Sequence, residues 1–209
     1  SGQFGDSSYS KQPSPVKIGT LTGFREFSVG DRDVFARGPN GALQAWGGND
    51  YGQLGVGAAN DRPVPALVAA PAQFTRVSAG IGHTAAVAGD GSVWAWGTNG
   101  GGELADGTAS VSNRPVAVQR SSDTVAVSAG RFHALSLSGD GSVWAWGNNI
   151  NGALGKGSRR DSALPQRIPA LPAMSAIANG PNRASLNPKA FETTSSTSAG
   201  VATPSSTTP

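Results

Sequence analysis

The sequence contains no cysteine among its 209 residues, so it can form neither disulfides nor thiolate metal sites. Only 14% of the residues are charged and the formal net charge is +3, with no polybasic run. We therefore do not expect nucleic acid as a partner. No apolar run approaches the ~18 residues of a membrane span. No segment reads as a signal peptide, and the localisation stays open, secretion and the cell surface included.

Support for long helices is also lacking, because no apolar stripe recurs at helical spacing. Glycine and proline are instead abundant, with 30 and 14 residues. This composition is typical of turns and short strands, and it predicts an all-β protein.

The main feature of the sequence is a repeat of fifty residues. The string "GDGSVWAWG" occupies Gly89–Gly97 and returns at Gly139–Gly147. The same offset aligns three tryptophans and three glycines, namely Trp46, Trp96, Trp146, Gly41, Gly91 and Gly141. An uninterrupted register of this kind indicates structural units that bury their faces against one another. We interpret the aligned tryptophans as the core between units.

Each unit predicts four short strands. In the second unit they are Phe74–Gly80, His83–Val87, "SVWAWG" and Arg114–Val118. Asp90-Gly91 predicts a two-residue type I′ turn, in which both central residues need positive φ. The small residues of the first strand place it innermost, and the proline of the fourth strand places it at the outer edge.

Four antiparallel strands per unit predict the blade of a β-propeller. We count about three complete blades and a partial terminal blade, hence an incomplete propeller and a partial or truncated product. The predicted division is 1–26 as the end of a preceding blade with an outer strand at Pro15–Ile18, 27–186 as the repeats, and 187–209 as a disordered Ser/Thr-rich tail. Open terminal blades would expose apolar faces and favour self-association.

Two strings resemble the signature of the regulator of chromosome condensation repeat: "VSAGIGHTAAV" at Val77–Val87 and "VSAGRFHALSL" at Val127–Leu137. "DGSVWAWGTN" and "YGQLGVG" are similar to further hallmarks of that family, and "VWAWG" resembles its bacterial branch. The resemblance implies a β-propeller, typically of seven blades. The family's founding activity is guanine nucleotide exchange on a small GTPase, and other members are secreted β-lactamase inhibitors. A repeat signature implies the fold and not the exchange activity.

No set of residues in the sequence forms a recognisable catalytic, metal-binding or phosphate-binding motif. His83 and His133 lack a third metal ligand and a placed nucleophile, and we interpret each imidazole as bonded to a backbone group. "GALGKGS" fails as a phosphate loop, because Gly157 stands where Ser or Thr must follow the lysine. We therefore expect no enzyme activity, no catalytic or metal-binding residue and no cofactor.

Loops are better candidates for function, because a rigid scaffold can display variable segments. One face should carry the turns after the inner strands and the long glycine-rich loops. The residues that vary there between repeats are Asp50, Tyr51, Arg131, Phe132 and Ile150. The favoured function is a non-enzymatic scaffold that binds a protein through this face. The alternatives are an enzyme regulator and a carbohydrate- or cell-surface-binding module, the last of which would expose Trp94 or Trp144.

Overall fold

A computed structural model describes residues 1–18, 22–169, 171–179 and 184–188. Within these ranges the chain is all-β and folds into three four-stranded antiparallel sheets and one two-stranded sheet. Each sheet pairs its strands in chain order. The fold class predicted from the sequence, a β-propeller with three complete blades and a partial one, is therefore confirmed.

The strands follow the fifty-residue period. The first blade comprises β1 (Glu26–Val29), β2 (Asp33–Arg37), β3 (Leu43–Gly47) and β4 (Arg62–Leu67). The second comprises β5 (Phe74–Ala79), β6 (His83–Ala88), β7 (Val93–Gly97) and β8 (Ser112–Ala117). The third comprises β9 (Thr124–Ala129), β10 (His133–Ser138), β11 (Val143–Gly147) and β12 (Ser162–Arg167). The partial blade comprises β13 (Met174–Asn179) and β14 (Ala184–Pro188).

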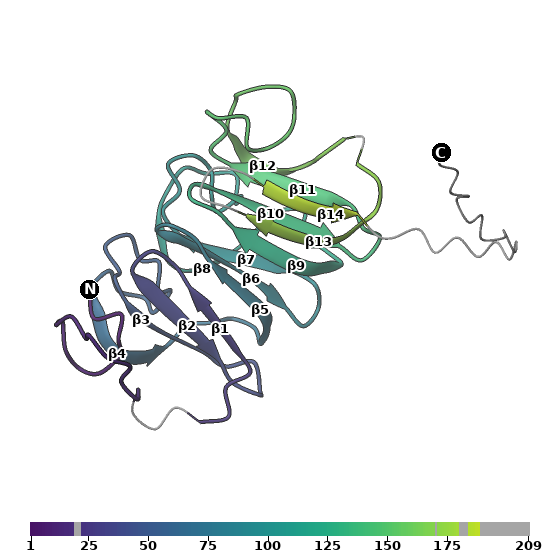
Figure 1. The fold of residues 1–209 in the computed structure, drawn as a ribbon. Coiled ribbons are helices and arrows are strands. Elements are labelled where there is room, and N and C mark those ends of the chain that lie inside the picture. Colours follow the sequence, from purple (N-terminus) through teal and green to yellow (C-terminus); the bar gives the residue numbers. More distant parts are fainter. Residues whose placement is uncertain (19–21, 170, 180–183, 189–209) are drawn as a thin grey trace, which may run out of the picture.

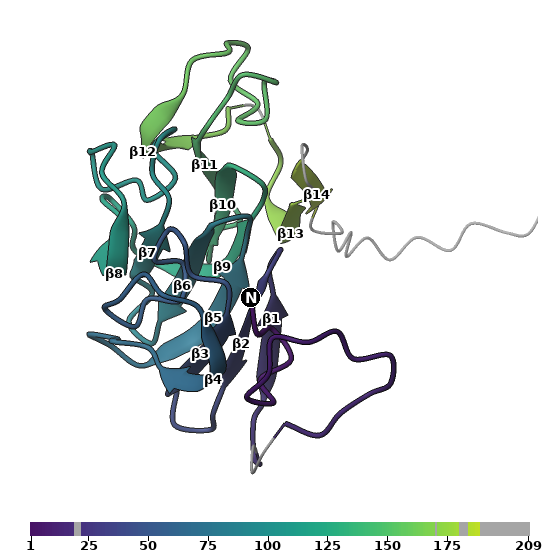
Figure 2. The same cartoon turned by 90° about the vertical axis from the view of Figure 1, so that its left-hand side faces the viewer.

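The blades follow one another along an arc, with β1, β5, β9 and β13 on its inner side (Figures 1 and 2). The described strands β13 and β14 pair only with each other, so the described chain forms an open arc and not a closed ring. The proline-containing strands β4, β8 and β12 lie at the outer edge of their sheets, where a missing N–H removes no ladder hydrogen bond.

A tryptophan from each blade fills the space against the preceding unit. Trp46, Trp96 and Trp146 are all 0% exposed. The indole N–H of Trp96 donates to the carbonyl of Gln53 at 2.7 Å, and that of Trp146 donates to the carbonyl of Glu103 at 2.9 Å. Each unit thus supplies part of the core of the next, as a stacked repeat requires.

The inner strands of successive blades approach closely because their residues are small. A Cβ on Gly80 would lie 2.4 Å from the carbonyl oxygen of Gly130, which leaves no room for a side chain. The hydroxyl of Ser78 accepts a hydrogen bond from the N–H of Ala129 at 2.9 Å. The hydroxyl of Ser28 accepts the same bond from Ala79 one period earlier.

The structure differs from the sequence predictions at the hairpin turns. Gly41, Gly91 and Gly141 have φ of +77°, +80° and +87°, but Asp90 does not have positive φ. The N–H of Gly91 donates to Ala88, and the N–H of Ala88 donates to Ser92. This is a three-residue loop that ends in a left-handed glycine, in place of the predicted two-residue type I′ turn. With the extra residue in the loop, the aspartate keeps a negative φ, and only the glycine, which has no Cβ, adopts the positive φ.

The two ends of the chain lie outside the three complete blades. Residues 15–18, predicted as an outer strand, form no strand in the structure. Most of the predicted tail at 187–209 lies outside the described residues.

Candidate protein-binding face

The turns after the inner strands and the long loops after β3, β7 and β11 lie together on one face, which we call the loop face. The N–H of Gly48 donates to the carbonyl of Arg32, and the N–H of Thr98 donates to that of Gly82. In the third blade the equivalent hydrogen bond runs from the N–H of Asn148 to the carbonyl of Phe132, at 2.7 Å. The antiparallel pairing of second and third strands thus brings each turn against the start of a long loop.

Buried asparagines shape the long loops, and the sequence reasoning missed them. Asn149 is 0% exposed, donates from Nδ2 to the carbonyls of Ser158 and Arg160, and accepts the N–H of Leu154. Asn49 and Asn99 occupy the same position in their units and are equally buried. The signal was present, since an asparagine recurs two residues after each "AWG". Because one amide holds each loop, the residues around it are free to vary.

The first-blade candidates sit at the edge of the second blade. Asp50 forms an ion pair with Arg32, and both side chains are exposed. Tyr51 is 53% exposed, and its ring lies 3.1 Å from the position that a Cβ on Gly82 would occupy. The loop of one blade therefore reaches the turn of the next, with an aromatic ring at the junction.

The third-blade candidates form a compact group. Arg131, Phe132 and Ile150 line a shallow pocket of about 120 Å³. Phe132 is 40% exposed and Ile150 is 66% exposed, and the guanidinium carbon of Arg131 lies 5.1 Å from the centroid of the Phe132 ring. The loop face thus carries two groups of candidates on different blades, and each exposes apolar surface beside a charge.

Each histidine begins a second strand, directly after a turn of the loop face, and His133 lines the same pocket as Arg131, Phe132 and Ile150. His83 is 0% exposed, and burial lowers its pKa to about 4. Neither of its ring nitrogens has a hydrogen-bond partner among the described residues, so the predicted backbone bond is absent. The imidazole of His83 is neutral at pH 7 and packs beside Gly80. Burial also lowers the pKa of His133.

Asp33 takes the histidine position in the first blade. It is 1% exposed, and burial raises its pKa to about 7. Both of its carboxylate oxygens lack a hydrogen-bond partner in the described part of the chain. No group of three or more potential metal ligands is found among the described residues. A search of the same residues for a helix long and apolar enough to span a membrane also finds none.

An open arc of four-stranded blades, with inter-blade contacts that repeat every fifty residues, defines a repeat protein of the β-propeller class. The chain belongs to the family described as Regulator of chromosome condensation (RCC1) repeat, which it matches over residues 40–87, 90–137 and 140–182. A second description of the same repeat matches residues 74–103 and 125–153. Among curated protein sequences, none matches this chain significantly.

Solved structures show the same fold. Human WBSCR16 is 24% identical with a TM-score of 0.81, over 91% of this chain and 51% of that protein. Prp20p from Saccharomyces cerevisiae is 20% identical with a TM-score of 0.73, over 83% of this chain and 46% of that protein. Yeast RCC1 (Prp20), in its complex with Kap60, is 21% identical with a TM-score of 0.72, over 83% of this chain and 44% of that protein. The chain thus spans about half the length of the structures it matches.

Proposed function

We propose that this chain is a non-enzymatic scaffold that binds a protein partner through the loop face. The observation that carries the proposal is the exposure of Tyr51, Phe132 and Ile150 on one face, together with Arg131. Aromatic residues and arginine are enriched at the energetic centres of protein interfaces. A rigid framework holds these side chains, so little ordering entropy is lost when a partner binds.

The family gives independent support for a protein as the partner. Prp20p was solved together with a study of its binding to Gsp1p and histones, and yeast RCC1 was solved bound to Kap60. All of these partners are proteins. At about 20% identity the likeness supports the class of partner and not its identity.

The test uses the full chain with a photo-crosslinking residue at position 132 and an extract of the source cells. The captured protein is then purified, and its affinity for the uncrosslinked chain is measured by titration. Replacing Tyr51, Phe132 and Ile150 with alanine should weaken binding about a hundredfold or more, since truncated anchors each cost ~1 kcal/mol or more.

The matched control replaces three equally exposed apolar residues off the loop face, Val64, Leu67 and Val125, which are 42%, 67% and 50% exposed. This variant should bind like the parent. Equal losses in the two variants, or no saturable binding to the intact chain, would count against the proposal.

A further inference from the structure

A second kind of site lies between the second and third blades, on the face opposite the loop face. It is a pocket of about 220 Å³, formed by the segment that links β8 to β9 and by the hairpin of β10 and β11. Hydroxyl groups, two carboxylates, one guanidinium and one indole ring line it. None of the candidate residues of the loop face contributes to it, and the inference is independent of the proposed function.

The pocket exists because the third unit departs from the repeat. Thr124 stands where the second unit has Phe74 and the partial blade has Met174. Phe74 is 1% exposed, and its ring stacks against Trp96 with the centroids 5.9 Å apart. A threonine lacks the volume to fill the same space, so the interface that is solid core in one place is hollow in the other.

Hydroxyl groups replace methyl groups on the wall of the pocket. Ser136 and Ser138 stand where the second unit has Ala86 and Ala88. Ser136 is only 4% exposed, and both serines line the pocket. Hydroxyl groups at these positions can bond to a ligand in the pocket, which the methyl groups of the second unit cannot.

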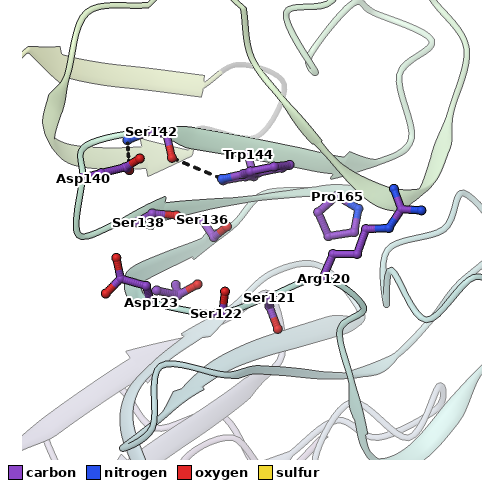
Figure 3. Close-up of a pocket in the computed structure, with 11 residues that line it drawn as sticks. Arg120, Ser121, Ser122, Asp123, Ser136, Ser138, Asp140, Ser142, Trp144 and Pro165 are labelled. Atoms are coloured by element: carbon purple, nitrogen blue, oxygen red, sulfur yellow. Dashed lines mark hydrogen bonds between the residues drawn. The ribbon is translucent and has the colours of Figure 1, made fainter.

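The indole of Trp144 forms part of the same wall. Its N–H donates to the hydroxyl of Ser142 at 3.3 Å, which fixes the ring. Its counterpart Trp94 packs against the apolar core between the first and second blades. Trp144 instead lines the pocket, and Figure 3 shows its ring nearly edge-on above the space beside Ser136.

The charged groups lie at the two ends. Figure 3 places the carboxylates of Asp123 and Asp140 at one end and the guanidinium of Arg120 at the other, with serine hydroxyls between them. Such a lining offers hydrogen-bond donors and acceptors in alternation along one wall. The ligand that matches it is neutral, carries several hydroxyl groups and has an apolar face for the indole.

We propose that this pocket binds one neutral polyhydroxylated ring, that is, a monosaccharide or the terminal sugar of a glycan. The volume sets the size, because pockets for drug-sized ligands measure roughly 300–1,000 Å³ and this one is smaller. The aromatic ring packs against the C–H face of the sugar, and the serines and carboxylates bond its hydroxyls. The interface between the second and third blades would have no room for such a ligand if aromatic side chains filled it, as they fill the interface between the first and second blades.

The direct test is NMR on the full chain with labelled tryptophan indoles. Glucose, galactose and N-acetylglucosamine are titrated singly. At least one sugar should shift the indole N–H signal of Trp144 in a saturable way and leave that of Trp94 in place. An array of glycans with these sugars at their ends then separates a free sugar from a glycan terminus as the ligand, and binding to either supports the pocket.

Two variants replace pocket residues with those that stand at the equivalent positions of the second unit. Ser136→Ala together with Ser138→Ala reproduces the residues of the second blade and should fold, yet weaken sugar binding at least about tenfold. Thr124→Phe should fill the space and abolish binding. A sugar-binding constant that the serine variant leaves unchanged would overturn the assignment.

Two further outcomes would also overturn the proposal. One is that none of the three sugars, up to tens of millimolar, moves the Trp144 signal in a folded protein. The other is that choline moves this signal and the sugars do not, since an indole beside two carboxylates would then be a site for an organic cation.

Discussion

The interface between the first and second blades and the interface between the second and third are built on one framework but filled differently. In the first interface, the rings of Phe35 and Phe74 lie 6.1 and 5.9 Å from that of Trp96. In the second interface, the residues one period later are Ala85 and Thr124, around Trp146. The comparison teaches that the repeated residues set the fold, whereas the residues that break the repeat decide whether an interface is core or pocket.

The inner ends of the two interfaces differ as well. Asp33 lies against Gly30 in the first blade, and His83 lies against Gly80 in the second. Both are buried and lack hydrogen-bond partners among the described residues. A carboxyl and an imidazole respond to pH in opposite directions, so the two interfaces should lose stability at opposite ends of the pH range.

The largest effect is expected from the tryptophans. Trp96→Ala should lower the free energy of unfolding by about 5 kcal/mol, because the cavity it leaves is bounded by two aromatic rings. Trp146→Ala should cost about 3 kcal/mol, because its interface has less aromatic packing to lose. Urea unfolding of the full chain measures both values. Equal losses would remove the distinction between the two interfaces.

Asp33→Asn should stabilise the protein at pH 8 by an amount on the order of 3 kcal/mol. Burial raises the folded-state pKa of Asp33 to about 7, from 3.8. The folded protein therefore holds a proton that the unfolded chain releases, and stability is lost as the pH rises from about 4 through 7. The gain from Asp33→Asn should vanish at pH 4, which unfolding measured at both pH values will show.

The second interface should show the reverse. Burial lowers the folded-state pKa of His83 to about 4, below the 6.5 of an ordinary histidine. The unfolded chain binds the proton first, so stability is lost as the pH falls from about 6.5 toward 4. His83→Gln should reduce this acid limb, leaving the part due to the buried His133, and should leave the alkaline limb due to Asp33 unchanged. A variant that flattens both limbs would mean that the two sites are not independent.

A smaller effect is expected at the hairpin that borders the second interface. Gly91→Val should cost about 2 kcal/mol, since Gly91 has φ of +80° and a Cβ there would lie 3.0 Å from the backbone nitrogen of Asp123. Gly89→Ala is the control, because nothing lies within 4 Å of its Cβ position. Thermal unfolding should separate the two variants by several degrees. A tolerated valine would contradict the turn geometry.

The smallest effect concerns what the interfaces share. Ser28→Ala and Ser78→Ala each remove one hydrogen bond between inner strands, and each should cost about 1 kcal/mol. The two losses should be equal, because this hydrogen bond between inner strands is the same at both interfaces and does not involve the side chains that differ between them. A clear difference in urea midpoints between the variants would show that the framework itself is uneven.

Much of the fold could be predicted from the sequence, because a blade's contacts are local and recur at a fixed offset. The four strands, the outer position of the prolines and the positive φ of Gly91 all follow from patterns within one unit. The turn type was predicted wrongly, because an Asp-Gly pair suits both a two-residue loop and the end of a three-residue loop. The choice depends on the register between β6 and β7, which pairs Val87 with Val93.

The sequence by itself determined the blade, the period and the loops that vary. Only the tertiary structure decided which departures from the repeat matter, because a side chain that fills one interface comes from a different unit than the wall it meets. Thr124 looks like a minor change along the chain, yet opposite Ser136 and Trp144 it leaves a pocket of about 220 Å³. Likewise, the sequence places Asp33 at the histidine position of the repeat, but only its burial in the tertiary structure raises its pKa to about 7.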